Sequence, residues 1–195
     1  MKRKNFKKEI REKLLKMRRR QSKEERRKKS LVIWKKLKAL PEFIEAKTVM
    51  FYLSTPDEVD TERMVKESIK IGRRIVVPVS EVKEKKMTLS ILKDYGRELG
   101  IGAFNIPEPE KKYIRKISSK DIDLVIIPGV GFDEKCGRLG FGKGFYDHFL
   151  RNLPVGVPRI ALAYDFQVIA VLPLEEHDVK VSKIITERRI IITKE

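Results

Sequence analysis

Apolar residues recur at helical spacing near the start of the chain, where charged residues fill the positions between them. The four apolar positions are Phe6, Ile10, Leu14 and Met17. Their separation by three or four residues predicts an amphipathic helix with one apolar stripe packed against the protein. Ser22 followed by Glu25 has the spacing of a capping box, so a second helix is expected to begin there and to end near Pro41. The first 45 residues are therefore predicted to form a helical hairpin.

Beyond Lys47 the pattern changes to short runs of β-branched and other apolar residues, which are typical of buried strands. The expected strands are Thr48–Ser54, Arg74–Pro78, Met87–Leu92, Asp123–Ile127 and Arg159–Tyr164, with a terminal hairpin of Lys183–Thr186 and Arg189–Thr193. A helix capped by Asp60 or Thr61 and ended by Gly72 separates the first two strands. This strand–helix–strand order favours a parallel sheet.

These elements predict an α/β fold, namely a three-layer α/β/α Rossmann-like domain with a mainly parallel sheet and an N-terminal helical hairpin. With 195 residues, no internal repeat and no linker-like segment, the chain is expected to form a single domain over residues 1–195. Gly96–Pro109 is expected to be irregular, and Gly142–Asn152 has helical character. Open α/β sheets bind ligands in the loops after the carboxyl ends of their strands, which makes residues 128–147 the first place to look for a site.

Composition narrows the class of protein. Hydrophobic residues make up 41% of the chain, too many for a disordered protein, and charged residues make up 37%. The longest apolar runs, such as Val168–Leu174, are far shorter than the roughly 20 residues of a membrane span, and no apolar stretch follows the basic N-terminus as in a signal peptide. Cys136 is the only cysteine, which excludes an intrachain disulfide. We therefore expect a cytoplasmic protein with no membrane partner.

Positive charge is concentrated at the N-terminus. The formal net charge is +17, and residues 1–30 hold 16 Lys and Arg against 4 Glu. Such a field attracts polyanions, including nucleic acid, nucleotide phosphates and polycarboxylates, although a solvated helix face explains it equally well. A basic nucleic-acid-binding protein without catalysis is therefore one alternative. Nucleic-acid readers usually mix aromatic residues into their basic surface, however, and Phe6 is the only aromatic residue in this segment.

The segment Gly137–Asp147 has the composition of a phosphate-binding loop. It begins with four glycines in eight residues, with Arg138 and Lys143 among them. Glycines let backbone N–H groups approach an anion, and the lysine can neutralise phosphate charge. The spacing matches a P-loop until Gly144, which stands where a P-loop has Ser or Thr, and about ten residues separate the segment from its strand. We therefore reject a true P-loop but retain a nucleotide site.

Asp147 lies four residues after Lys143, so on a helix the two side chains would share a face. A carboxylate at this position could hold the Mg²⁺ ion for which Gly144 offers no hydroxyl. The plainer alternative is a tight loop followed by a surface ion pair.

Together these residues resemble the signature of the 5-formyltetrahydrofolate cyclo-ligase family, also called 5,10-methenyltetrahydrofolate synthetases. The resemblance rests on Pro128–Asp133 followed by Arg138–Asp147. It extends over nearly the whole chain, through the basic N-terminal helix, Tyr52–Thr61, the strand entry from Gly72 to Pro78, Ala161–Gln167 and Pro173–Asp178.

The resemblance implies an enzyme that uses ATP and Mg²⁺ to convert 5-formyltetrahydrofolate, with or without a polyglutamyl tail, to 5,10-methenyltetrahydrofolate, releasing ADP and phosphate. In the mechanism that it implies, the formyl oxygen attacks the γ-phosphate. The 10-nitrogen of the folate then closes the ring and phosphate leaves. A formamide oxygen is otherwise a very poor leaving group, which explains the need for ATP. Neither nucleic acid nor a membrane is required.

The same resemblance implies a role for individual residues. The expected nucleotide contacts are Lys7, Arg11, Arg138, Leu139, Gly140, Phe141, Gly142, Lys143, Gly144, Phe145 and Tyr146, with Lys143 and Arg138 as the catalytic cations. The expected substrate contacts are Leu53, Glu58, Phe141, Gly142, Lys143, Gly144 and Phe145. The expected metal ligands are Asp147 and Asp178, which offer the hard oxygens that Mg²⁺ prefers.

Several of these residues also fit structural roles. Leu53 at a strand end could belong to the core, Phe145 and Tyr146 could pack their helix against the sheet, and Asp178 could cap a turn. His177 is expected to be structural because this chemistry needs no imidazole base, and the role of Asp133 is left open between orienting the loop and orienting the nucleotide. An ATP-binding regulator that has lost its folate pocket is a third possible function.

Overall fold

The computed structural model describes residues 2–82, 84, 86–175 and 178–193, so the expectation for His177 falls outside the described residues. The α-helices are α1 (Lys2–Arg20), α2 (Lys23–Lys38), α3 (Pro41–Glu45), α4 (Glu62–Lys70) and α5 (Phe145–Arg151). The strands are β1 (Thr48–Met50), β2 (Arg74–Glu81), β3 (Lys86–Leu92), β4 (Leu99–Ile101), β5 (Pro107–Pro109), β6 (Leu124–Ile127), β7 (Gly131–Asp133), β8 (Arg138–Leu139), β9 (Arg159–Leu162), β10 (Val168–Ile169), β11 (Lys183–Ile185) and β12 (Ile190–Ile192). The 3₁₀ turns are η1 (Ala103–Asn105), η2 (Lys111–Tyr113), η3 (Ser119–Asp121) and η4 (Asp165–Gln167).

A seven-stranded sheet in the order β12-β11-β9-β6-β1-β2-β3 forms the centre of the fold. The five inner strands are parallel, whereas β3 and β12 pair antiparallel to their neighbours at the two edges. The mainly parallel α/β fold is thus confirmed, as are the strand expected at Met87–Leu92 and the terminal hairpin. The strand expected at Thr48–Ser54 spans only Thr48–Met50, although the Phe51 N–H also donates to the Val76 carbonyl oxygen in β2 at 2.9 Å.

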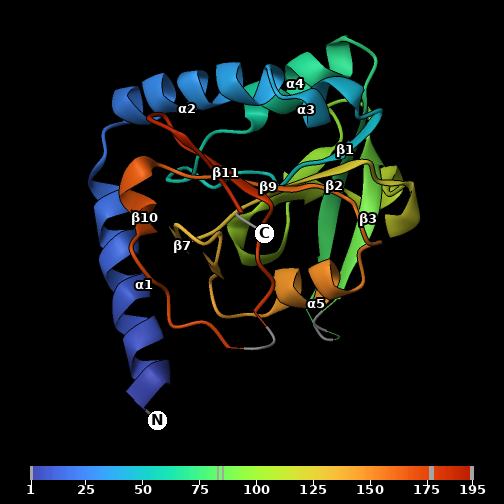
Figure 1. Cartoon of the computed structure of the whole chain (residues 1–195). Coiled ribbons are helices and arrows are strands. Elements are labelled where there is room, and N and C mark those ends of the chain that lie inside the picture. The colour runs from blue at the N-terminus through green and yellow to red at the C-terminus, as the bar shows by residue number, and fades with distance from the viewer. Residues whose placement is uncertain (1, 83, 85, 176–177, 194–195) are drawn as a thin grey trace.

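Both faces of the sheet are buried, which explains why its inner strands lack polar alternation. Val49 and Ile126 face a core formed with α2, α3 and α4, where Trp34 packs edge-on against Phe43. Met50 and Val125 face a second core on the opposite side, which includes Phe149 and Leu150 of α5. Figure 1 shows α2, α3 and α4 on one side of the sheet and α5 on the other. This arrangement gives the three layers that the sequence predicts.

The N-terminal helices follow each other as expected, and Ser22 and Glu25 form the predicted capping box at the start of α2. The helices diverge from this turn: α1 runs down one side of the molecule and α2 crosses its top (Figure 1). Among the described residues, no helix is long and apolar enough to cross a membrane.

The inward face of α1 differs from the apolar stripe predicted for it. Phe6 is 50% exposed and Met17 is 36% exposed, whereas Leu14 and Arg18 are buried. The half-buried positions between them include Lys7 and Arg11. The predicted stripe is confirmed at Leu14 and wrong at Phe6 and Met17, because α1 packs over polar loops at an end of the sheet, where cations find hydrogen-bond acceptors that an apolar side chain could not satisfy.

Two regions differ from what the sequence suggests: one is more ordered, and in the other a helix begins later. The irregular excursion at Gly96–Pro109 contains the two-stranded hairpin β4–β5, whose tip is η1. Helix α5 begins at Phe145 rather than Gly142, because Gly142 and Gly144 have φ values of +89° and +77°, outside the helical region. Lys143 therefore precedes the helix, and the prediction that it shares a helical face with Asp147 is wrong.

Candidate active site

The topology brings two loops to the same point of the sheet. In the parallel part of the sheet β1 lies between β2 and β6, so the chain order reverses between β1 and β6. The loop that follows β1 carries Glu58, and the segment between β6 and α5, which includes β7 and β8, carries the Gly-rich loop. Such a switch point, outside the carboxyl ends of the strands, is where open α/β sheets form their ligand sites. The candidate site is therefore placed by topology as well as by motif.

Helix α1 lies against both loops and joins them. The Nε of Arg11 donates to the carbonyl oxygen of Gly140 at 2.9 Å, and the Nε of Arg18 donates to Asp57 Oδ2 at 3.0 Å. Leu14, between these two arginines, packs closely against the backbone at Gly131, since a Cβ at Gly131 would lie 2.5 Å from Leu14 Cδ1. One apolar side chain and two cations thus fix α1 over the site.

Asp133 organises the chain that leads into the Gly-rich loop. Its side chain is buried, and Oδ1 accepts hydrogen bonds from the backbone N–H of Lys135 at 3.0 Å and of Gly137 at 2.8 Å. Oδ2 accepts a third bond from the N–H of Leu172 at 3.0 Å. These bonds hold the tight turn between β7 and β8, in which Cys136 has a φ of +59°. Of the two roles left open for Asp133, the structure supports orientation of the loop.

The Gly-rich loop, residues 140–144, has the geometry of an anion cradle. Gly142 and Gly144 have left-handed φ values, which turn the backbone in a way that other residues rarely adopt. The Arg11 guanidinium lies beside the loop, since a Cβ on Gly142 would be 3.6 Å from Arg11 Cζ. Lys143 is exposed at the tip of the loop and forms no ion pair with any described residue. The cations of Arg11 and Lys143 and the left-handed backbone at Gly142 and Gly144 therefore surround the same space.

Arg138 and Asp147 form a buried ion pair beneath this loop. The Nη2 of Arg138 donates to Asp147 Oδ1 at 2.5 Å, and the side chain of Arg138 is only 2% exposed. The guanidinium also lies 5.7 Å from the centre of the Tyr146 ring. Its Nε is buried and has no hydrogen-bond partner among the described residues. Such an atom is ready to donate to an added acceptor, since leaving a buried donor unpaired has a cost in free energy.

Lys7 and Asp178 form a second ion pair, from the opposite ends of the chain. The Nζ of Lys7 donates to Asp178 Oδ2 at 2.7 Å, and Glu175 Oε1 lies 3.7 Å from the same Nζ. The backbone N–H of Glu175 donates to Asp178 Oδ2 at 2.8 Å, which is a turn-capping bond of the kind considered for this residue. Each carboxylate expected to bind Mg²⁺ is therefore paired with a cation expected to bind nucleotide.

Glu58 is buried in the loop that follows β1. Its Oε2 accepts hydrogen bonds from the backbone N–H and the hydroxyl of Thr55, at 2.9 and 3.0 Å. Its Oε1 lies 3.5 Å from Nη1 of Arg18. Burial raises the pKa of Glu58, and the charge of Arg18 and the bonds from Thr55 oppose that rise in pKa. A buried carboxylate held in one orientation is suited to recognise a group with several N–H donors.

Aromatic side chains border the Gly-rich loop. Phe104, at the tip of the β4–β5 hairpin, is 49% exposed and has a φ of +57°. Its ring contacts that of Phe145 edge-on, at 6.1 Å between centroids, and the Nζ of Lys143 lies 5.4 Å from the Phe104 ring. Phe141 faces Arg18, whose Cζ is 5.3 Å from the ring centroid. The surroundings of the loop can thus contact a flat ring system as well as an anion.

The structure brings most of the sequence-predicted residues together through these contacts, and Leu53 is the exception. Leu53 is 3% exposed and packs in the core shared with α2 and α4, as its structural alternative has it. Tyr146 likewise packs against both cores, while Phe145 remains partly exposed. No described contact tests whether Leu53 touches a substrate, so that role stays a prediction.

Two residues of the site escape sequence reasoning. Arg18 lies seven positions after Arg11 and eleven after Lys7, so its helical spacing could have identified it as part of the same face. Phe104 stands alone between Gly- and Pro-rich segments, and no periodicity distinguishes it.

The donor set around the loop suits a nucleotide-bound cation better than a permanent metal site. Among the described residues, no group of three or more His, Cys, Asp or Glu is arranged to hold a metal ion. The carboxylates of Asp147 and Asp178 are hard oxygen ligands, but Mg²⁺ requires about six oxygens and usually takes several from phosphate and water.

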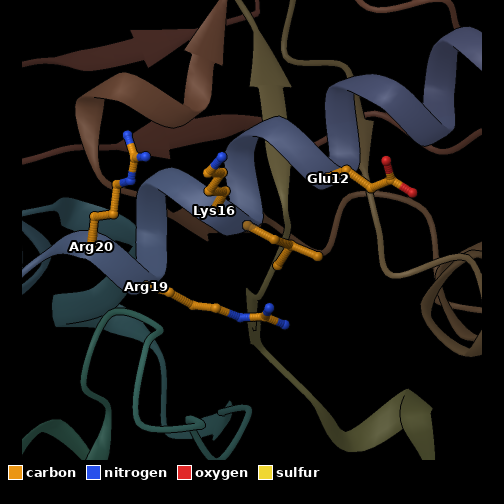
Figure 2. A pocket seen from close by; sticks show the side chains of 5 residues that line it. Glu12, Lys16, Arg19 and Arg20 are labelled. Carbon is orange, nitrogen blue, oxygen red and sulfur yellow. The ribbon is translucent and has the colours of Figure 1, made fainter.

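A hollow of about 470 Å³ lies along the exposed side of α1. Its lining residues are Glu12, Leu15, Lys16, Arg19 and Arg20. Figure 2 shows Lys16 and Arg20 extending to the same side of the helix and Arg19 extending away from them. These cations belong to the basic N-terminal segment and lie on a different face from Lys7, Arg11 and Arg18.

Comparison with known proteins gives a consistent result. Residues 3–187 match the model of the 5-formyltetrahydrofolate cyclo-ligase family. The chain is 32% identical to a 5-formyltetrahydrofolate cyclo-ligase of Mus musculus over 82% of this chain and 83% of the relative. It is 30% identical to one of Escherichia coli K12 over 77% of this chain and 83% of the relative.

Solved structures agree with these sequence relatives. The NMR structure of Aquifex aeolicus 5,10-methenyltetrahydrofolate synthetase superposes with a TM-score of 0.84 at 34% identity, covering 97% of this chain and 93% of that chain. A 5,10-methenyltetrahydrofolate synthetase from Mycoplasma pneumoniae superposes with a TM-score of 0.75 at 28% identity, covering 93% and 98% of the two chains.

Proposed function

Since this chain belongs to the 5-formyltetrahydrofolate cyclo-ligase family, we propose that it catalyses the ATP- and Mg²⁺-dependent conversion of 5-formyltetrahydrofolate to 5,10-methenyltetrahydrofolate. The observation that carries the proposal is the meeting of two loops at the switch point of the sheet. One loop offers an anion cradle with cations, the other offers the buried carboxylate of Glu58, and α1 contacts both. A reaction between a folate and a nucleotide needs such an arrangement.

The residues around the Gly-rich loop fit a nucleoside triphosphate. The backbone N–H groups of Gly140, Gly142 and Gly144 would donate to phosphate oxygens, and the segment from Leu139 to Tyr146 would line the rest of the nucleotide site. Arg11 is already beside the loop, and the unpartnered Nε of Arg138 offers a further buried donor. Lys7 would join them if the phosphates displaced Asp178 from its ammonium group.

Mg²⁺ fits the same site as a companion of the phosphates. Asp147 and Asp178 would supply two of its oxygen ligands, and the phosphates and water would supply the rest. Both carboxylates now accept from cations that we assign to the nucleotide. A bound nucleotide with its cation would therefore exchange these partners.

The folate would occupy the space between Glu58 and the Gly-rich loop. Glu58 Oε1 would accept hydrogen bonds from the amino-pterin edge, with Leu53 supplying apolar contact beside it. Segment Phe141–Phe145 would border both ligands, so that the formyl oxygen meets the terminal phosphate. The protein contributes mainly position and charge stabilisation, which account for most of catalysis in phosphoryl transfer.

Two cations would carry the chemical step. ATP supplies the phosphoryl group that makes the formyl oxygen a leaving group, and Mg²⁺ neutralises phosphate charge. Lys143, exposed and free of carboxylate partners among the described residues, would stabilise the charge that develops on the transferred group. Arg138 would hold its oxygens from the buried side. The 10-nitrogen of the folate then closes the ring as phosphate departs.

The test is to follow the absorbance of the methenyl product after mixing protein, 5-formyltetrahydrofolate and Mg²⁺, with and without ATP. Growth of the signal only with ATP is expected. Lys143→Ala should lower turnover by about 10²–10³-fold, in the range found for removing one charge-stabilising donor, and Asp147→Ala should raise the Mg²⁺ concentration needed. Lys135→Ala, which removes an exposed cation nearby, is the matched control. A folded wild-type protein that forms no product would refute the proposal.

The basic N-terminal segment suggests a role in substrate capture. We propose that the cations of the α1 hollow, Lys16, Arg19 and Arg20, attract polyglutamylated folates through the glutamyl carboxylates. The pentaglutamate should then bind more tightly than the monoglutamate at low salt, and the difference should disappear at high salt. Equal affinities at low salt would remove the basis for this role.

Two further expectations remain proposals. We propose that residues 1–195 form one domain, which predicts a single cooperative unfolding transition. We also propose a cytoplasmic location, in keeping with a single cysteine that can form no disulfide within the chain.

A further inference from the structure

Among the α1 cations whose side chains the structure describes, Arg18 is the most deeply buried, and the reaction proposed above gives it no role. Its side chain is 3% exposed, whereas Arg19 and Arg20, the next two residues, are exposed. Burying a guanidinium is unfavourable unless its charge is balanced and its donors are used. Arg18 meets that condition through Asp57 at 3.0 Å and Glu58 at 3.5 Å. The position of Arg18 therefore indicates that it acts on the carboxylates of Asp57 and Glu58.

The two oxygens of Glu58 have different surroundings. Oε2 accepts both hydrogen bonds from Thr55 and so is fully engaged. Oε1 accepts no hydrogen bond from the described residues, and its ion-pair partner is the Arg18 guanidinium, whose Nη1 lies 3.5 Å away. That distance provides charge stabilisation but is too long for a good hydrogen bond. The lone pairs of Oε1 thus remain available to a ligand, while the cation holds the carboxylate in place.

Burial disfavours the negative charge of Glu58, and the positive charge of Arg18 opposes this effect. The titratable and charged groups around Glu58 are Asp57 on its own loop, Tyr52 after β1, Tyr146 on α5, Tyr164 after β9 and Arg18 on α1; the Tyr164 hydroxyl donates to the Glu58 carbonyl oxygen at 2.7 Å. Asp57 repels a second negative charge, and the three tyrosines are neutral because burial raises the pKa of each. Within this group Arg18 alone is positive. Without it, Glu58 would be a buried acid beside another acid.

On its other side Arg18 contacts the Gly-rich loop. Its Cζ lies 5.3 Å from the centre of the Phe141 ring, within the range of a cation–π contact. One guanidinium therefore contacts both the acidic loop after β1 and the Gly-rich loop after β8. Among the described residues, no other cation forms ion pairs, hydrogen bonds or cation–π contacts with both loops.

We propose that Arg18 is a positioning residue for the folate half of the site: it keeps Glu58 in the carboxylate form, with Oε1 free to accept from the ligand, and ties this acid to the Gly-rich loop through Phe141. The inference rests on the function proposed above and adds a residue to it. Arg18 acts through Glu58 and does not itself touch the reacting atoms.

The proposal predicts a change in the pH dependence of folate binding. The wild-type dissociation constant for monoglutamyl 5-formyltetrahydrofolate, measured by calorimetry, should differ by no more than about twofold between pH 6 and pH 8.5. In Arg18→Met, Glu58 must lose a proton to accept from the ligand, so binding should weaken by about tenfold for each pH unit below the raised pKa. Affinity at pH 8.5 should largely return. Arg18→Lys, which keeps the charge, should restore the wild-type profile in part.

Three controls separate positioning from general damage. Arg27→Met removes the same charge from the exposed side of α2 and should leave the dissociation constant for the folate unchanged at both pH values. In Arg18→Met/Glu58→Gln no titrating carboxyl remains at this position, so the pH dependence should disappear. Affinity for a non-hydrolysable ATP analogue with Mg²⁺ should show no new pH dependence in Arg18→Met. If Arg18→Met does not fold, Arg18→Met/Asp57→Asn, which removes the buried cation together with one acid, replaces it with the same expected profile.

The outcomes distinguish the inference from the function on which it rests. Wild-type protein that neither binds the folate nor forms the methenyl product would overturn the function. Wild-type protein that does both, with an Arg18→Met variant that keeps the wild-type profile or loses affinity equally at both pH values, would overturn the role of Arg18. Weak binding at pH 6 that recovers at pH 8.5, and does so only when Glu58 is present, would support it.

Discussion

Replacement of Asp133 by Ala is expected to destabilise the protein and to loosen the Gly-rich loop. The side chain is 2% exposed, and its oxygens accept from three backbone N–H groups, those of Lys135, Gly137 and Leu172. Two of these bonds are buried, those to Gly137 and Leu172. A buried donor left without a partner costs about 1–3 kcal/mol. The expected loss in the free energy of unfolding is therefore about 2–6 kcal/mol.

Urea unfolding followed by circular dichroism measures this loss, and calorimetry with Mg²⁺ and an ATP analogue measures the effect on the loop. Glu134→Ala is the matched control, because it removes the same charge from the next position, where the carboxylate is 59% exposed and pairs with the half-exposed Arg189. Its cost should stay below about 0.5 kcal/mol. A loss below about 1 kcal/mol for Asp133→Ala, or nucleotide affinity equal to that of wild type, would refute the view that Asp133 holds the loop.

Two other substitutions test how the site is held and how the fold responds to acid. Leu14→Ala should lower the free energy of unfolding by about 2–5 kcal/mol. It should also weaken binding of the ATP analogue, because Leu14 packs α1 against Gly131. Unchanged nucleotide affinity would contradict this packing role. Burial alone would raise the pKa of Glu98, but hydrogen bonds from both terminal nitrogens of Arg115 and from the Lys93 N–H bring its pKa below its ordinary value of 4.5. The unfolded chain therefore binds this proton more readily, so the stabilisation is complete above pH 4.5 and is lost as the pH falls through the folded-state pKa. The deficit of Glu98→Gln in urea unfolding should accordingly be larger at pH 7 than at pH 3, and an equal deficit at both would be inconsistent with the ion pair.

The sheet could be predicted from the sequence because its strands are buried on both faces. Uninterrupted apolar runs such as Leu124–Ile127 indicate this directly, and the strand–helix–strand order then implies parallel pairing. The capping box at Ser22 was equally accessible, because it depends on two residues three positions apart. These signals are local and require no knowledge of the rest of the fold.

The inward face of α1 could not be predicted in the same way. A periodicity argument assigns the inward positions to apolar residues, and it therefore selected Phe6 and Met17, both of which are exposed. The positions that do face inward include Arg18, whose charge is balanced by acids that lie far away along the chain. Burial of charge depends on the tertiary neighbours, and these appear only in the structure. The motif at residues 138–147 indicates the candidate loop itself, but not Phe104, which contacts it from a distant hairpin.

The attachment of α1 also constrains the order in which this protein can be completed during synthesis. Helix α1 is made before its partners: its Arg18 pairs with residues 39 and 40 positions later, its Arg11 with Gly140, 129 positions later, and its Lys7 with Asp178, 171 positions later. On the ribosome these partners emerge in that order, so the contacts of α1 can form from its carboxyl end toward its amino end. The last of these contacts waits until Asp178 has emerged, which makes closure of the site a late step of folding and the one with the greatest loop-closure entropy.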